Sequence, residues 1–147
     1  MAYPEIEVKE GTLEEVMKLA DLIPEFEDPF TSGEYEKRLT GKNSLILIAS
    51  FSTINAGFKV GYALDDTTFY SWFGGVLPTY RQKGIAKALA TYQESWAANN
   101  GFLKVRVKTR NHLAPMLLFA INSGFQIIDV EKRTTTAQNR ILLEKDL

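Results

Sequence analysis

The sequence Val76-Leu77-Pro78-Thr79-Tyr80-Arg81-Gln82-Lys83-Gly84-Ile85-Ala86 marks a strand that gives way to a helix. Strand-forming residues from Thr67 to Val76 precede it, and Pro78 ends that run because proline has no backbone N–H to donate. Apolar residues then recur at helical spacing from about Gln82 to Asn100. Amides at a helix start attract anions, and Gly84 lets a ligand approach the backbone. We expect a pyrophosphate site at this junction, or else a strand–turn–helix whose basic residues are only solvated.

The rest of the chain repeats this mixture of strands and helices. The expected elements are a strand at 5–9, helices at 13–23 and 32–40, strands at 44–49, 58–64 and 67–76, a helix at 82–100, a strand at 103–107, a helix at 112–123, and strands at 125–130 and 141–144. A turn is expected at Asn55-Ala56-Gly57. The long helix is expected to bury Ile85, Ala88, Leu89, Tyr92 and Trp96. This order predicts an α+β or mixed α/β fold, with helices on a largely antiparallel sheet.

Length and composition fit one domain spanning residues 1–147. Apolar residues make up 45% of the chain and charged residues 24%, which is typical of a globular protein. The 17 Lys and Arg nearly balance the 18 Asp and Glu, whereas a nucleic-acid-binding domain is normally basic. We therefore expect no nucleic-acid partner.

The chain contains no cysteine and one histidine, His112. No acyl-cysteine intermediate and no cysteine-ligated or histidine-rich metal site is therefore expected. The N-terminus lacks the basic start and apolar run of a signal peptide, and the uncharged stretch at 111–128 is too polar to span a membrane. These features predict a cytoplasmic protein without a membrane partner.

The junction resembles motif A of the GNAT superfamily of N-acetyltransferases, the Arg/Gln-x-x-Gly-x-Gly/Ala loop that holds the pyrophosphate of acetyl-CoA. Asn111-His112-Leu113-Ala114, followed by Ser123-Gly124-Phe125, is similar to motif B of the same family. The element order is similar as well, so the resemblance covers nearly the whole chain. It implies a mostly antiparallel sheet of six to seven strands, splayed in the middle, with about four helices around it.

The resemblance also implies roles for individual residues in binding acetyl-CoA. The backbone of Phe73 to Val76 would pair with the pantetheine arm, and Gly74-Gly75 fits a bulge there. Asn111 would bind the same arm. The pyrophosphate would be held by the backbone amides of the loop and the charges of its basic residues, a set that comprises Arg81, Gln82, Lys83, Gly84, Ile85 and Ala86.

The catalytic groups are less evident. Many family members carry a tyrosine four residues before the motif B glycine, as the acid for the departing thiolate, but this chain has Ala120 there. Tyr70 occupies the position where some relatives carry a glutamate, so it would orient a water or the amine, or else it simply packs on the sheet. Trp72 is either core or a wall of the acceptor site. His112 is expected to cap or to lie on the surface.

Charge patterning gives two hints, each with a plain alternative. The acidic residues between Leu19 and Glu36 would attract a cationic amine, or they form a solvated surface; they are Asp21, Glu25, Glu27, Asp28, Glu34 and Glu36. The basic residues on the strand after the long helix would form a strand edge that meets the CoA phosphates, or they are the exposed face of a half-buried strand; they are Lys104, Arg106, Lys108 and Arg110.

The combined hypothesis is an acyltransferase that moves an acetyl group from acetyl-CoA directly to a primary amine of a small molecule or peptide. The lack of cysteine favours a ternary complex. The alternatives are a non-catalytic CoA-binding or regulatory module and a plain α+β binding domain. We expect no metal, and a monomer or homodimer.

Overall fold

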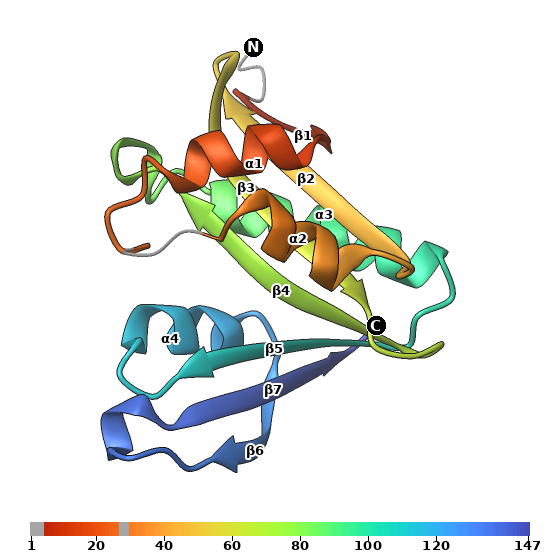
Figure 1. Cartoon of the computed structure of the whole chain (residues 1–147), viewed down its shortest axis with the longest axis vertical. Helices are drawn as coiled ribbons and strands as arrows, with labels where there is room; N and C mark the ends of the chain where they lie inside the picture. Colours follow the sequence, from red (N-terminus) through yellow and green to blue (C-terminus); the bar gives the residue numbers. More distant parts are fainter. Residues whose placement is uncertain (1–4, 27–29) are drawn as a thin grey trace.

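The computed structural model describes residues 5–26 and 30–147. Seven strands form one sheet in the order β1-β2-β3-β4-β5-β7-β6, with all neighbours antiparallel except β4 and β5 (Figure 1). The strands are β1 Ile6–Glu10, β2 Ser44–Phe51, β3 Ile54–Ala63, β4 Thr68–Val76, β5 Lys104–Arg110, β6 Gln126–Glu131 and β7 Arg140–Asp146. The helices are α1 Leu13–Ala20, α2 Ser32–Leu39, α3 Ile85–Asn99 and α4 Ala114–Asn122, with 3₁₀ turns η1 Pro78–Tyr80 and η2 Thr136–Gln138.

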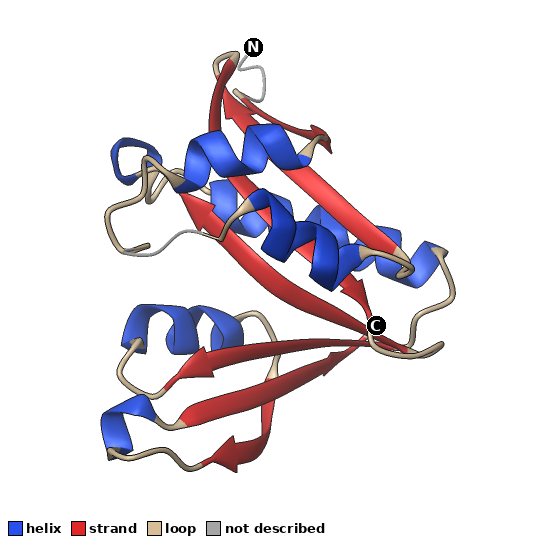
Figure 2. Cartoon of the chain, in the orientation of Figure 1, coloured by secondary structure: helices blue, strands red, loops and turns tan. Residues whose placement is uncertain are grey.

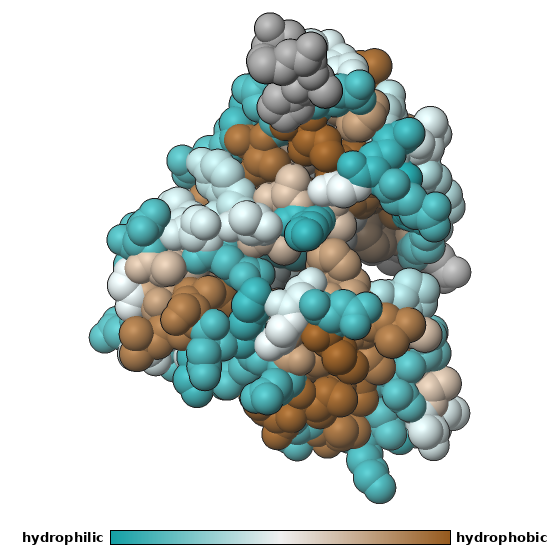
Figure 3. Space-filling view, turned by 180° about the vertical axis from the view of Figure 1, so that it is seen from behind, coloured by the Kyte–Doolittle hydropathy of each residue, from teal (hydrophilic) through white to brown (hydrophobic). Residues whose placement is uncertain are grey.

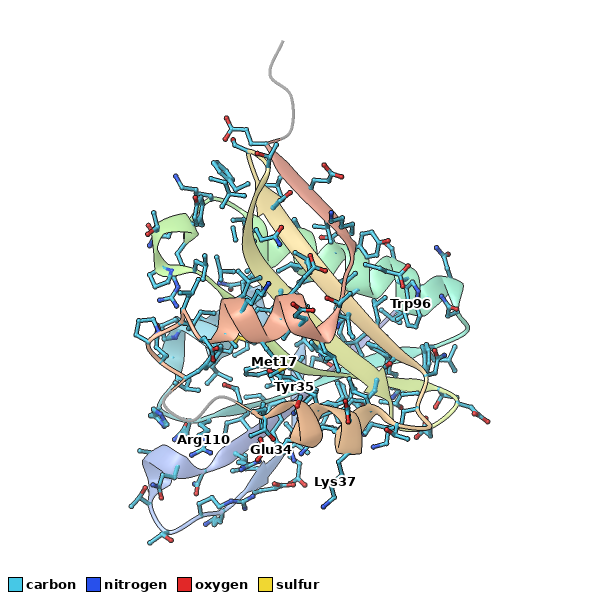
Figure 4. All side chains as sticks on the ribbon, turned by 45° about the horizontal axis from the view of Figure 1, so that its top comes forward. Met17, Glu34, Tyr35, Lys37, Trp96 and Arg110 are labelled. Atoms are coloured by element: carbon cyan, nitrogen blue, oxygen red, sulfur yellow. The ribbon has the colours of Figure 1, made fainter. Side chains whose placement is uncertain are left out.

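The core divides into two clusters on opposite faces of the sheet. Helices α1 and α2 cover one face of β2–β4, and α3 covers the other face (Figure 2). Tyr35 of α2 is fully buried beside α1, whereas Lys37 on the same helix points away from the molecule (Figure 4). The cluster under α3 also includes Ala120 of α4. Helices α3 and α4 therefore share one side of the sheet, and α1 and α2 occupy the other.

The expected element order is confirmed, but three details are wrong. Residues 55–57 belong to β3, because the turn lies at Ser52 and Thr53, both with positive φ. Helix α3 begins at Ile85 and not at Gln82, since Gln82 and Gly84 have positive φ angles of 61° and 90°.

The buried stripe of α3 also differs from the expected one. It consists of Ile85, Leu89, Gln93 and Ala97, four residues apart. The expected members Tyr92 and Trp96 are only partly buried beside it. Apolar periodicity missed Gln93 because its side chain is polar although it is 1% exposed.

The central feature of the sheet is a fork between β4 and β5. The two strands pair only at Thr68–Tyr70 with Lys104–Arg106. Beyond that, β4 continues to Val76 along β3, and β5 continues to Arg110 along β7. The inner edges after Tyr70 and Arg106 therefore face each other without ladder bonds. This is the splay that the resemblance implied. Within the described residues, no helix is long and apolar enough to span a membrane.

Candidate active site

The start of α3 lacks the caps that the first two helices have. Thr12 and Glu15 form a complete capping box on α1, and Thr31 and Glu34 form one on α2. Gly84, the N-cap of α3, has no side chain to offer, and within the described chain no acceptor meets the amides of residues 82–86. Five consecutive N–H groups at the positive end of a helix are therefore free to bind an anion.

Position 84 requires glycine because of its backbone conformation, and not because a side chain would lack room. Its φ of 90° lies in the left-handed region, whereas an added Cβ would meet only Cδ1 of Ile6, at 3.7 Å. Glycine adopts this conformation without the steric penalty that other residues carry. The conformation of the loop thus depends on the left-handed backbone at Gly84, a reason that the sequence did not predict.

The side chain of Arg81 bonds to groups outside the loop. Its guanidinium donates to both carboxylate oxygens of Glu25, at 2.6 and 3.2 Å, and its Nε donates to the Val76 carbonyl at 3.1 Å. The hydrogen bond from Arg81 lowers the pKa of Glu25. Lys83 lies over the Phe51 ring, 5.3 Å from its centre. The side chain of Arg81 therefore fixes the position of the loop in this structure. Lys83 forms no ion pair with any described residue, so its positive charge is not neutralised by the protein.

The two glycines of β4 have different neighbours. Gly75 faces the segment after α1, where an added Cβ would lie 2.6 Å from Cδ1 of Ile23. Gly74 pairs with Lys59. The bulge that we expected at this pair of glycines is wrong, since both residues are in regular register. It lies instead at Trp72, which has no partner between Phe73 and Ser71. A bulge there disrupts the ladder just beyond the fork.

A small cavity of about 20 Å³ lies where the fork opens, on the side of α3 and α4. Ser71 and Val107, the first residues after the last β4–β5 pair, both line it. Its other lining residues are Lys59, Ala90, Gln93, Glu94, Met116, Phe119, Ala120 and Phe125. Burial lowers the pKa of Lys59 to about 8, and the Glu94 carboxylate partly opposes this shift. Glu94 itself accepts a hydrogen bond from Lys145 at 2.7 Å.

Tyr70 lies at the mouth of the fork, on the α2 side of the sheet. Its ring packs edge-on against Tyr62, with centres 5.5 Å apart. Arg38 of α2 donates to the Tyr62 hydroxyl at 3.0 Å and lies over the Trp72 ring at 4.7 Å. Burial raises the pKa of Tyr70, and Tyr62 adds to the rise. Tyr70 is therefore a neutral phenol suited to orienting a group, and Trp72 is a partly buried wall of the same face.

The basic residues of β5 lie on both sides of the point where the fork opens. Strand β5 pairs with β7 along its whole length but with β4 only up to Arg106, so its edge is open at Lys108 and Arg110. That this basic edge meets the CoA phosphates stays a prediction. Their side chains form ion pairs with the neighbouring strands: Arg106 with Glu144, Lys104 with Glu144 and Asp146, and Lys108 with Glu131. The alternative, the polar face of a half-buried strand, fits these three.

Motif B anchors the start of α4. Asn111 donates through Nδ2 to the Thr136 carbonyl at 3.2 Å, and Nδ1 of His112 lies 2.8 Å from the Ala137 carbonyl. Asn111 keeps its side-chain oxygen free of these bonds. Of the acidic residues expected near the acceptor, Glu25 is bound to Arg81 and Glu34 to the Thr31 backbone, while Glu27 and Asp28 lie outside the described residues.

A second hollow, larger than the cavity at the fork, lies between β1 and the outer side of α3. It measures about 750 Å³ and reaches from Gly84 and Val8 to Trp96 and Asn99. Seen from behind, the surface carries apolar patches separated by polar belts (Figure 3). Because this groove lies away from the fork, only its Gly84 end touches the candidate site.

A family model described as the acetyltransferase (GNAT) family matches residues 13–125. The chain belongs to the GNAT acetyltransferases. The matched segment includes the loop before α3, the fork and all of α4, and it assigns the chain to the acyltransferases among enzymes. No curated protein sequence matches this GNAT chain significantly.

Solved structures have the same fold. A GNAT acetyltransferase from Elizabethkingia anophelis with acetyl-CoA bound is 19% identical with a TM-score of 0.79, over 99% of this chain and 100% of that one. The ribosomal-protein-S18-alanine N-acetyltransferase of Escherichia coli is 13% identical with a TM-score of 0.81, over 96% and 93%. Arabidopsis thaliana Naa50 in complex with the bisubstrate analogue CoA-Ac-MVNAL is 15% identical with a TM-score of 0.78, over 97% and 99%.

Sequence reasoning singled out Ala120 but missed the polar residues that line the cavity of this GNAT chain. Lys59 interrupts the apolar run Phe58-Lys59-Val60, and a charged residue inside a buried strand was the available signal. Gln93 and Glu94 had no comparable signal, because polar residues on a helix are usually taken as exposed. Among the described residues, no three acidic or histidine side chains gather as a metal site.

Proposed function

We propose that this GNAT acetyltransferase transfers an acetyl group from acetyl-CoA directly to a primary amine of a small molecule or peptide. The observation that supports the donor is the row of five free amides at residues 82–86, next to the open inner edge of β4. A pyrophosphate suits free amides at a helix start, and an extended pantetheine arm suits an unpaired strand edge. The residues present therefore fit acetyl-CoA.

Each expected binding residue keeps a role in this proposal, with one change. The amides of Gln82, Lys83, Gly84, Ile85 and Ala86 would hold the pyrophosphate. The backbone of Phe73, Gly74, Gly75 and Val76 would pair with the pantetheine arm, and the Asn111 side chain would bind it. Arg81 would act by bracing the loop through Glu25, rather than by a direct bond to phosphate.

Acetyl-CoA would supply an activated thioester carbonyl, and the chain would supply its surroundings. The bulge at Trp72 releases a peptide unit from the ladder beside the fork, where an N–H would stabilise developing negative charge on the carbonyl oxygen. The neutral phenol of Tyr70 would orient the attacking amine or a water.

A primary amine is supported by two of the structural neighbours. One is named for acetylating the alanine of ribosomal protein S18, and another is in complex with an analogue that joins CoA to a peptide. The chain has no cysteine to carry an acyl group, so direct transfer in a ternary complex is the simplest route. A cytoplasmic location and a monomeric or homodimeric state stay predictions.

Thiol release from acetyl-CoA across a panel of amines tests the proposal. The chain contributes no thiol of its own, so a thiol-reactive dye reports CoA alone. Release that depends on one class of amine, and that is lost in Gly84→Val, is the expected result. CoA binding without release for any amine would contradict the transferase and favour a CoA-binding module.

A further inference from the structure

The proposed reaction needs a proton donor for the thiolate that leaves. When an amine displaces a thiol from a thioester, the carbon–sulfur bond breaks and its electron pair goes to sulfur. The thiolate then takes a proton, and transfer is efficient when the donor lies within hydrogen-bond reach. Ala120 carries no group that could donate one.

The cavity at the fork contains a candidate. Among its lining residues only Lys59 and Glu94 are ionisable. Glu94 already accepts a hydrogen bond from Lys145, so its side chain acts as an acceptor in this cavity. Lys59 has no hydrogen bond or ion pair among the described residues. Its ammonium is thus the one acidic N–H available in the described part of this cavity.

The position of Lys59 follows from its partner on β4. Lys59 pairs directly with Gly74, and a Cβ built on Gly74 would lie 3.5 Å from Cγ of Lys59. Because Gly74 has no side chain, Lys59 extends over β4 on the side of α3. The same cavity is lined by Ser71 and Val107, the residues at which the fork opens, and by Ala120.

We propose that Lys59 is the proton donor to the thiolate that leaves during acetyl transfer. The inference rests on the proposed function. In the step, the carbon–sulfur bond breaks, sulfur takes the bonding pair and one proton from Nζ of Lys59, and Lys59 is left as a neutral amine. The proton that the acceptor amine releases to solvent balances the one that Lys59 later takes up.

The charges around Lys59 are consistent with this role. Its pKa of about 8 lies close to the value of about 8.5 for an ordinary thiol, so proton transfer between them is nearly balanced. Glu94 from α3 raises the pKa of Lys59, and Lys145 from β7 reaches the same carboxylate. The cavity residues from β4, β5 and α4 are not ionisable; they are Ser71, Val107, Met116, Phe119 and Ala120.

The first test measures the thiol of bound CoA and needs no turnover. The ultraviolet absorbance of thiolate is followed against pH for CoA bound to the wild-type chain, Lys59→Met and the exposed control Lys9→Met, and the chain adds no cysteine signal. An ammonium beside the sulfur lowers the thiol pKa, so Lys59→Met should raise it by about one unit and Lys9→Met should not.

Kinetic measurements then distinguish the effect of the positive charge of Lys59 from its ability to donate a proton. Lys59→Met should lower kcat by about tenfold or more at neutral pH, with little change in the KM for acetyl-CoA. Lys59→Arg keeps the charge but holds its proton too tightly, so it should leave the thiol pKa of bound CoA low and still reduce kcat. Glu94→Gln should move the alkaline fall in kcat to lower pH, because the carboxylate raises the pKa of Lys59.

The possible failures are distinguishable. If the wild-type chain binds no CoA, the proposed function fails and this inference fails with it. If CoA binds but its thiol pKa and the pH profile of kcat are the same in Lys59→Met, only the role of Lys59 is overturned. Circular dichroism of each variant checks folding, and Lys59→Arg replaces Lys59→Met as the decisive kinetic variant if the latter does not fold.

Discussion

Glu25 and Arg81, 56 positions apart in the chain, form a two-pronged ion pair with N–O distances of 2.6 and 3.2 Å. The pair joins the segment after α1 to the loop before α3. The pair holds the loop in place, but it also puts the Glu25 carboxylate near the free amides of residues 82–86, which are suited to bind an anion. The two effects act on ligand binding in opposite directions.

Replacing the carboxylate should therefore tighten CoA binding. In Glu25→Gln the local positive charge rises, and we expect the Kd for CoA to fall about two- to fivefold at low salt, with the difference fading as salt screens it. Isothermal titration calorimetry at two salt concentrations measures this. Glu14→Gln, which removes an exposed partner of Lys18, is the control. Weaker binding in Glu25→Gln would mean that bracing Arg81 matters more than the charge.

Gly84→Ala should separate backbone strain from steric fit. The added methyl has room, but the φ of 90° strains alanine by about 1 kcal/mol or more. Gly101→Ala is a matched control, since Gly101 has φ 87° and no atom within 4 Å of the added methyl. Both variants should lose similar stability in urea, whereas only Gly84→Ala should bind CoA more weakly. Equal CoA binding by the two variants would argue against the loop as the pyrophosphate site.

Tyr70→Phe tests the orienting role of the phenol. Burial raises the Tyr70 pKa above its ordinary value of 10, so this hydroxyl stays protonated at neutral pH and does not serve as the base. We expect about a tenfold loss of kcat with unchanged CoA affinity, and no change in the shape of the pH profile below pH 9. Tyr92→Phe on α3 is the control. Full activity in Tyr70→Phe would leave the ring as a packing residue only.

The pair of Arg106 and Glu144 should contribute to stability more than its neighbours do. Glu144 has a side chain that is 13% exposed, and Arg106 donates to it from two nitrogens. Glu144→Gln should lower the free energy of unfolding by about 1–3 kcal/mol, because a partly buried guanidinium loses its counter-charge. Asp146→Asn, whose carboxylate is 87% exposed, should change it by less than about 0.5 kcal/mol. Urea unfolding distinguishes the two.

Lys59 predicts an unusual dependence of stability on pH. Burial lowers its pKa from 10.5 to about 8 in the folded chain. Between these values the unfolded chain binds more protons, so the Lys59 contribution to the unfolding free energy rises with pH, by at most about 1.4 kcal/mol per unit. The unfolding free energy of the wild type should therefore rise relative to that of Lys59→Met between pH 8 and pH 10. A constant difference would show that Lys59 has an ordinary pKa.

Most of the fold could be predicted because its signals are local. The capping boxes at Thr12 and Thr31, the apolar run in β2 and the glycines after α3 and α4 each mark an element boundary within a few residues. The errors arose where a local signal was ambiguous. Asn55-Ala56-Gly57 has turn-forming residues, yet the chain turns at Ser52 and Thr53 despite their positive φ.

The sequence could indicate the proposed pyrophosphate loop for the same reason, whereas it could not indicate the cavity. Residues 81–86 are contiguous, so their order alone indicates an anion site. Lys59, Glu94 and Lys145 come from β3, α3 and β7, and only the folded sheet brings them together. The ion pair of Arg81 with Glu25 likewise depends on tertiary structure. A sequence pattern does not say which residues far apart in the chain lie close together in the folded protein.

The three-residue pairing between β4 and β5 has a mechanical consequence. Each half of the sheet has its own ladder bonds, β4 with β3 and β5 with β7, so a small rotation about Thr68–Tyr70 would widen or narrow the gap without breaking those ladders. The Glu94–Lys145 bridge is the main charged tether across that seam among the described side chains. Amide hydrogen exchange should therefore report two units that protect independently, and a ligand spanning the gap should merge them into one.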